Sequence, residues 1–126
     1  MRAVDTNVLV RLVTRDDAKQ LAAAEAFVEQ GAWVSHLALA EATWVLSAVY
    51  GRSAGEIAKA IEMLLDHKDL TLEESEVVSN ALALFRRRPA LGFSDCLMLE
   101  VARRNGHLPL GAFDRNLARL EGAQRL

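Results

Sequence analysis

Four acidic residues from distant parts of the chain could do chemistry together: Asp5, Glu41, Asp95 and Asp114. Two carboxylates about 6 Å apart repel each other by roughly 3 kcal/mol at an effective dielectric near 20. Because a small domain is stable by only about 5–15 kcal/mol, such a cluster persists by taking up protons or by holding cations. Hard oxygen ligands suit Mg²⁺ or Mn²⁺, which bind phosphate oxygens and lower the pKa of bound water. The chemistry that this set favours is phosphodiester hydrolysis.

Each of the four acids also has a structural interpretation. Asp5 could cap a helix over residues 8–13, and Asp114 could cap the helix that follows it. Asp95 could complement the dipole of the helix that begins beside it. Glu41 could be an ordinary half-exposed glutamate. The functional hypothesis therefore depends on the joint placement of the four residues.

The elements that must position these residues alternate along the chain. Runs of apolar residues predict strands at 2–5, 32–35, 70–72 and 108–110, with a further edge strand at 123–126. Helical periodicity, capping residues and stop signals predict helices between them, over about 8–13, 18–30, 36–50, 54–65, 73–85, 94–105 and around residues 117–120.

Strands separated by helices imply an α/β fold, a three-layer α/β/α sandwich with a mostly parallel central sheet of four or five strands. The length of 126 residues suits a single domain over 1–126. In such sheets function lies beyond the carboxyl ends of the strands. Asp5 ends the first strand, Asp114 follows the fourth, and Glu41 and Asp95 lie early in helices. The four acids are therefore expected to meet at one edge of the sheet.

Composition narrows the class of protein. Apolar residues make up 52% and charged residues 25% of the chain, which is typical of a globular protein. No apolar run reaches 18 residues, so we expect no transmembrane helix, and we expect no secretory signal because Asp5 follows only a very short apolar run. A single cysteine, Cys96, excludes an internal disulfide and a thiolate metal cluster. We expect a cytoplasmic protein without a membrane segment.

The net charge of −2 argues against binding of nucleic acid by bulk positive charge. The charge is, however, unevenly distributed along the chain. Residues 86–126 hold eight arginines and four acidic residues, whereas residues 1–85 hold seven basic and thirteen acidic ones. A solvated helix surface explains any one of these arginines, but together they could contact phosphates. The candidates for RNA contact are Arg86, Arg87, Arg88, Arg103, Arg104 and Arg115.

The remaining residues that often do chemistry are expected to be structural. The three histidines, His36, His67 and His107, lack a ligand spacing. Cys96 is expected to be a small buried side chain. The aromatic residues Trp33, Trp44 and Tyr50 are expected in the core, although the apolar content leaves room for an exposed patch that binds a partner.

Four short motifs resemble those of PIN-domain nucleases, and the size and layout are similar to those of VapC-type toxins of bacterial toxin–antitoxin pairs. The similarity covers essentially the whole chain, and the motifs are fairly specific only together. They are Asp5-Thr6-Asn7-Val8-Leu9-Val10, Glu41, Phe93-Ser94-Asp95-Cys96-Leu97 and Phe113-Asp114-Arg115-Asn116-Leu117.

The resemblance implies an endoribonuclease that depends on Mg²⁺ or Mn²⁺, is held inactive by a cognate antitoxin and forms a homodimer. The family's acidic metal ligands map onto Asp5, Glu41, Asp95 and Asp114. Thr6 or Asn7 matches the polar companion of the first aspartate, and Thr6, Asn7 or Ser94 would orient water or phosphate.

One departure from the family pattern concerns the last aspartate. The family often has Thr or Ser two residues before it, where this chain has Ala112. The lost hydroxyl would remove a hydrogen bond to a carboxylate or water, so we expect altered metal affinity or rate rather than loss of activity.

Two alternatives from other classes remain. A non-catalytic RNA- or protein-binding module on the same scaffold is favoured by Ala112 alone. An aspartyl-phosphate enzyme or receiver domain fits poorly, because Asn7 stands where a phosphatase needs a second aspartate. A receiver would also carry its aspartate at the other end of the 70–72 strand.

Overall fold

The computed structural model describes residues 1–126 and contains seven helices and five short strands, in agreement with the expected α/β class. The strands are β1 (Arg2–Ala3), β2 (Ala32–Val34), β3 (Leu70–Leu72), β4 (Leu110–Ala112) and β5 (Ala123–Arg125). The helices are α1 (Thr6–Thr14), α2 (Ala18–Val28), α3 (His36–Ala48), α4 (Ala54–Asp66), α5 (Ser75–Arg87), α6 (Phe93–Arg104) and α7 (Arg115–Ala118).

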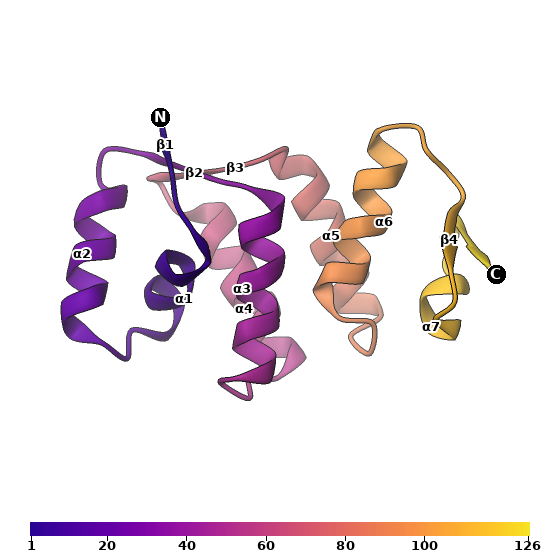
Figure 1. The fold of residues 1–126 in the computed structure, drawn as a ribbon, viewed down its shortest axis with the longest axis horizontal. Helices are drawn as coiled ribbons and strands as arrows, with labels where there is room; N and C mark the ends of the chain where they lie inside the picture. The colour runs from indigo at the N-terminus through magenta and orange to yellow at the C-terminus, as the bar shows by residue number, and fades with distance from the viewer.

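The strands form two separate parallel sheets. The first has the order β1-β2-β3, with Ala3 opposite Trp33 and Trp33 opposite Thr71. The second pairs β4 with β5 and lies at the end of the molecule farthest from β1 (Figure 1). The expectation of one central sheet of four or five strands is therefore wrong: three strands form one sheet and two form another.

Hydrogen bonding explains the division. β1 is two residues long and both are exposed, so its free edge offers few groups for a further strand. β4 begins at Leu110, after Pro109, rather than at Leu108 as expected, because proline cannot donate to a ladder. Its flanking bonds, from Leu110 N to Gly122 O at 2.8 Å and from Leu126 N to Ala112 O at 3.0 Å, join it to the β5 segment.

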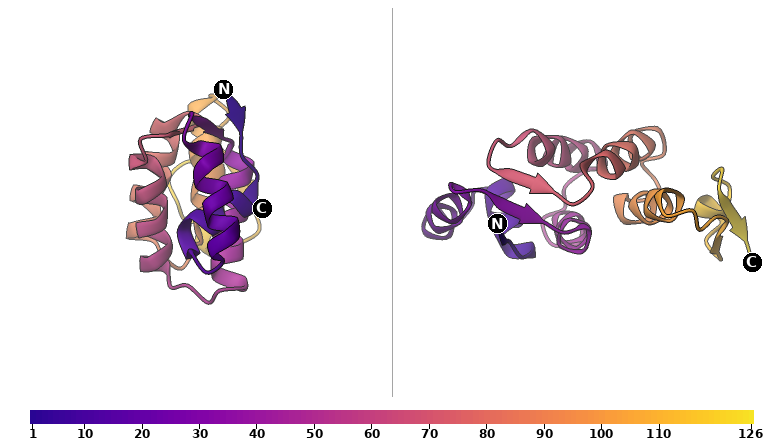
Figure 2. Two further views of the ribbon diagram at one scale, coloured as in Figure 1. Left: turned by 90° about the vertical axis from the view of Figure 1, so that its left-hand side faces the viewer. Right: turned by 90° about the horizontal axis from the view of Figure 1, so that it is seen from above.

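The helices form two layers. Seen from above, α1, α2, α3 and α6 lie in one layer and α4 and α5 in the other, with β2 and β3 between them (Figure 2). Fully buried side chains from both layers build a continuous apolar core, including Leu9 of α1, Leu39 and Leu46 of α3, Ile61 of α4, Val78 of α5 and Leu99 of α6. Burial of these side chains is the main stabilising contribution to the fold.

Local signals start α2 and α4 where the sequence predicts them, at Ala18 and Ala54, whereas α1 begins two residues earlier and α5 two residues later than expected. Ser53 and Glu56 form the expected capping box: each side chain accepts a hydrogen bond from the other's backbone N–H, at 3.2 and 2.9 Å. The Asp17 carboxylate caps α2 by accepting a hydrogen bond from Gln20 N at 2.9 Å. No helix is both long and apolar enough to cross a membrane.

The outward face of α3 differs from the sequence expectation. Trp44 is 64% exposed, not buried, and Leu37 on the same face is 69% exposed. The buried face consists of Ala38, Leu39, Ala42, Thr43 and Leu46. Because nearly every residue of α3 is apolar, hydrophobic periodicity could not identify the face that packs inward.

The other two aromatic residues are also not core residues. Trp33 is 37% exposed, because the middle residue of a three-residue strand points away from its buried neighbours. Tyr50 is half-buried, and its hydroxyl accepts a hydrogen bond from Arg11 Nη1 at 2.9 Å.

Candidate active site

Asp5 stands at the junction between β1 and α1. Its Oδ1 accepts a hydrogen bond from Val8 N at 3.1 Å and caps α1, so the structural interpretation of this residue is correct. The side chain is exposed and, with Asn7 and Arg11, borders a hollow of about 300 Å³ between α1 and α2. The second carboxylate oxygen has no hydrogen-bond partner in the protein and remains available for a ligand.

A hydrogen bond joins the first turn of α1 to Glu41 on α3. Thr6 Oγ1 donates to Glu41 Oε2 at 2.8 Å, across 35 residues of sequence. Helix α3 packs directly against α1, which brings Glu41 to the residue that follows Asp5. Glu41 is therefore oriented by a residue of the N-terminal motif, although it is exposed and lies between the apolar side chains of Leu37 and Trp44.

Asp95 and Asp114 form a second acidic pair. Burial of Asp95 in the first turn of α6 raises the pKa of its carboxyl above the ordinary value, and the negative charge of Asp114 raises it further. Asp114 Oδ1 accepts hydrogen bonds from Asn116 N at 2.8 Å and Leu117 N at 3.0 Å, and so caps α7. The two carboxylates are therefore close enough to repel each other across the junction between α6 and the C-terminal sheet.

Helix α3, which carries Glu41, contacts both α1, which Asp5 caps, and α6, which carries Asp95. No three acidic, histidine or cysteine side chains come together in a group that could hold a metal ion. The expectation that all four carboxylates meet is thus not met in this structure. Separation of the C-terminal sheet from β1 is the physical reason, because it carries Asp114 away from the edge where Asp5 lies.

The donor atoms can be compared with the needs of a divalent cation. Oxygen ligands suit Mg²⁺ or Mn²⁺, and a cation would relieve the repulsion that raises the pKa of Asp95. The Asp95–Asp114 pair therefore fits such an ion in its chemistry. The four carboxylates do not form a single group in this structure, because Asp5 and Glu41 lie where α1 packs on α3, whereas Asp95 and Asp114 lie at the starts of α6 and α7.

Other reactive side chains in this region are inert. Cys96 is fully buried, and burial together with the charges of Asp95 and Glu100 raises the pKa of its thiol to about 11. It is therefore a protonated core residue and not a nucleophile. His36 is bound to Glu73, with its Nε2 at 2.7 Å from the backbone oxygen, in agreement with a structural role.

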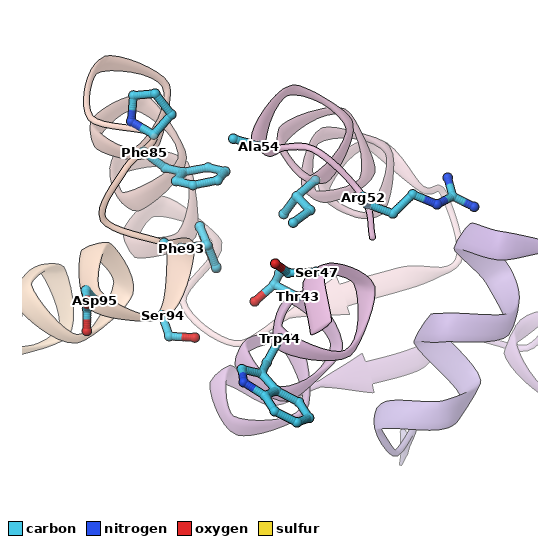
Figure 3. Close-up of a pocket in the computed structure, with 12 residues that line it drawn as sticks. Thr43, Trp44, Ser47, Arg52, Ala54, Phe85, Phe93, Ser94 and Asp95 are labelled. Atoms are coloured by element: carbon cyan, nitrogen blue, oxygen red, sulfur yellow. The ribbon is translucent and has the colours of Figure 1, made fainter. Parts of the chain in front are cut away.

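A hollow of about 410 Å³ opens beside Ser94 and Asp95, between α3, the start of α4 and the ends of α5 and α6 (Figure 3). Gly92, with a φ of +73°, lets the chain turn into α6 so that the next residues reach this hollow. Sequence reasoning identified Ser94 and Asp95 but missed Trp44, Ser47 and Arg52, which line the same hollow. Trp44 and Ser47 follow Glu41 at helical spacing, which is the signal that could have found them.

Several of the candidate arginines are held by acidic partners. Arg86 binds Glu62 at 2.8 Å, Arg103 binds Glu100 at 3.4 Å, and Arg104 binds Glu76 at 3.3 Å. No ion pair holds Arg87, Arg88 or Arg115, which are exposed. Of the six candidate arginines, these three are the most available for phosphate.

The burial of Asp95 and its repulsion by Asp114 predict an effect on the stability of the protein. The raised pKa of Asp95 means that its ionised form is less stable in the folded protein than in the unfolded chain. Ionised Asp95 therefore lowers the free energy of unfolding at a pH above its raised pKa. This loss disappears once the pH falls below the pKa of an ordinary aspartate, because the residue is then protonated in both states. We expect Asp95→Asn to raise the Tm by roughly 1–3 °C at pH 7 without divalent cations. Thermal denaturation at pH 7 and pH 3 checks this.

Two further measurements, at pH 3 and with Mg²⁺, make this prediction specific. The difference between variant and wild type should shrink at pH 3, and Mg²⁺ should stabilise the wild type more than the variant. A lower Tm for Asp95→Asn at pH 7 would show that the carboxylate contributes to the fold rather than straining it.

Comparison with known proteins adds one finding to this geometry. A family model described as PIN domain matches residues 2–123. No curated protein and no solved structure gives a significant match.

Proposed function

Because the chain belongs to the PIN domain family, generally a nuclease fold, we propose that it is a divalent-metal-dependent endoribonuclease. The observation that carries this proposal is the placement of the acidic motif residues. Glu41 of α3 accepts a hydrogen bond from Thr6, the residue after Asp5, and Asp114 lies close enough to Asp95 of the neighbouring α6 to raise the pKa of its carboxyl. The family match extends over both acidic sets, which supports our proposal that they serve one active site.

Each side chain has a proposed role. Asp5 and Glu41 form one pair of carboxylate ligands and Asp95 and Asp114 form the other, and a bound Mg²⁺ or Mn²⁺ would supply charge stabilisation and a water of lowered pKa for phosphodiester hydrolysis. Thr6 holds Glu41 in place through its hydrogen bond. Asn7 and Ser94, whose polar groups make no side-chain hydrogen bond within the protein, are free to orient water or phosphate.

The biological setting is also proposed. The protein acts in the cytoplasm as the toxin of a type II toxin–antitoxin pair, of the VapC type, and its cognate antitoxin holds it inactive. It works as a homodimer. Exposed apolar side chains support a role in binding protein partners, notably Leu37 and Trp44 on α3, Met98 on α6 and Phe113 after β4.

A direct assay tests the nuclease proposal. Purified protein is incubated with single-stranded RNA in Mg²⁺, in Mn²⁺ and in EDTA, and the products are resolved by length. We expect cleavage in both metals, none in EDTA, and growth arrest on expression in cells that is relieved by the antitoxin. Cleavage that continues unchanged in EDTA would contradict the metal-dependent chemistry.

A non-catalytic RNA-binding module on the same scaffold is the second candidate. The division of the carboxylates into two sets favours it, because a binding module does not need a common ion. This alternative predicts RNA affinity that is unchanged by chelation, no cleavage in any metal and no growth arrest. The same assay, run with a binding measurement, therefore separates the two.

A further inference from the structure

The hollow beside Asp95 adjoins a second one. The second hollow, of about 500 Å³, lies between α4 and the end of α5 and is lined by Lys59 and Arg86 among others. Both hollows share Ala54, Phe85 and Pro89 in their linings, so they adjoin each other along one surface. We call this the α4–α5 groove. It extends from the α6 residues Ser94 and Asp95 at one end to Lys59 and Arg86 at the other.

The groove has chemically different ends. At the α6 end, the hydroxyl groups of Ser47 and Ser94 lie on opposite sides of the hollow, and neither makes a hydrogen bond within the protein (Figure 3). At the other end, Lys59 has no ion-pair partner, and Arg86 is bound on one side by Glu62. The groove therefore offers neutral donors and acceptors near Asp95 and positive charge away from it.

Aromatic rings line the part between these ends. Phe85 and Phe93 pack edge-to-face with centroids 6.0 Å apart, and both are almost fully buried, so they form an apolar floor. Trp44 stands at the rim of the same hollow with 64% of its surface exposed. Arg52 also lines this hollow, but its guanidinium group points away from Trp44 and Ser94 (Figure 3). A flat exposed ring, hydroxyl groups and nearby cations are the features by which proteins bind an unstacked base and its phosphate.

We propose that the α4–α5 groove binds single-stranded RNA. One base lies in the hollow beside Ser47 and Ser94 and stacks on Trp44, and the phosphates of the neighbouring nucleotides lie toward Lys59 and Arg86. Asp95 then lies next to the bound nucleotide, because it lines the same hollow as Ser47 and Ser94. The inference rests on the proposed function for the nature of the substrate, and it names the surface that selects a single strand.

Binding of a short fluorescein-labelled single-stranded RNA, measured by anisotropy in EDTA so that no cleavage occurs, tests the groove. We expect Trp44→Ala and Lys59→Glu each to weaken binding by about tenfold, because stacking and phosphate contacts are lost. Both side chains are on the surface, so the variants should fold, which circular dichroism checks. Duplex RNA of the same sequence should bind more weakly, because its bases are not available to the hollow.

Two control variants match these changes outside the groove. Val49→Ala truncates an exposed apolar side chain at the end of the helix that carries Trp44, and Lys19→Glu makes the same charge change on α2. Each should leave the dissociation constant within about twofold. Equal weakening by Lys19→Glu and Lys59→Glu would overturn the proposal, as would unchanged binding in Trp44→Ala. Tight binding of duplex RNA, or binding only of an antitoxin-derived peptide, would also overturn it.

The outcome separates this inference from the nuclease proposal. RNA binding that depends on Trp44 and Lys59, with no cleavage in Mg²⁺ or Mn²⁺, supports the groove and contradicts the nuclease. Metal-dependent cleavage that is unaffected by both variants, with unchanged RNA affinity, supports the nuclease and contradicts the groove.

Discussion

Asp5→Asn and Asp95→Asn are each expected to lower the rate of RNA cleavage at saturating Mg²⁺ by at least about 100-fold. Asparagine keeps the size of the side chain and an oxygen that can accept the hydrogen bond from Val8 N, so α1 remains capped in the first variant. The substitution removes only the negative charge. Single-turnover cleavage of a defined RNA measures the effect, with the Tm as a check on folding.

Asp17→Asn is the matched control for this prediction. Asp17 caps α2 in the same way that Asp5 caps α1, by accepting a backbone hydrogen bond three residues ahead at 2.9 Å. It lies outside the candidate active site. The control should therefore show a similar small change in Tm and cleave RNA at the wild-type rate. Equal losses in Asp17→Asn and Asp5→Asn would mean that helix capping, not catalysis, explains the result.

Leu9→Ala is expected to lower the free energy of unfolding by about 2–5 kcal/mol. Leu9 lies fully buried in α1, four residues after Asp5, within the apolar core. The truncation removes apolar contacts and leaves a cavity, which is a large loss for a domain whose total stability is about 5–15 kcal/mol. Urea denaturation followed by circular dichroism measures it.

A volume-conserving change at the same position serves as the control. Leu9→Met should cost less than about 1.5 kcal/mol, because the flexible side chain fills most of the same space. Leu9→Ala should also lower nuclease activity near its unfolding midpoint, since α1 carries Asp5 and Thr6. A loss below 1 kcal/mol in Leu9→Ala would contradict the close packing of α1 against the core.

Local features of this fold are well predicted from sequence. The capping box at Ser53 and Glu56 and the capping role of Asp5 each depend on residues within three positions of one another. The alternation of helices and strands also follows from local apolar patterns. These features need no knowledge of distant contacts, which is why the element order agrees with the structure.

Features that depend on distant contacts are predicted poorly. Nothing in Leu110-Gly111-Ala112 distinguishes pairing with β5 from pairing with β1, so the single large sheet was a wrong prediction. The exposure of Trp44 was missed for a related reason: an almost wholly apolar helix has no polar face to identify the solvent side.

The candidate site shows the same division between local and distant information. The N-terminal motif identified Thr6 as a companion of the acidic residues. In the structure its hydroxyl donates a hydrogen bond to Glu41, which lies 35 residues away in the sequence. The pairing of Asp95 with Asp114 could be expected only from the fold, because the charge repulsion acts across two elements. Convergence of all four acids rested on the single sheet, and it failed with that sheet.

The central claim is that the Asp5–Glu41 and Asp95–Asp114 sets serve one active site. Its most direct test compares RNA cleavage by Asp5→Asn, Asp95→Asn and the variant that carries both changes, at one Mg²⁺ concentration. Because residues that act as a unit have non-additive effects, the double variant should be no slower than the slower single variant. Wild-type activity in either single variant, or losses that multiply in the double variant, would contradict the claim.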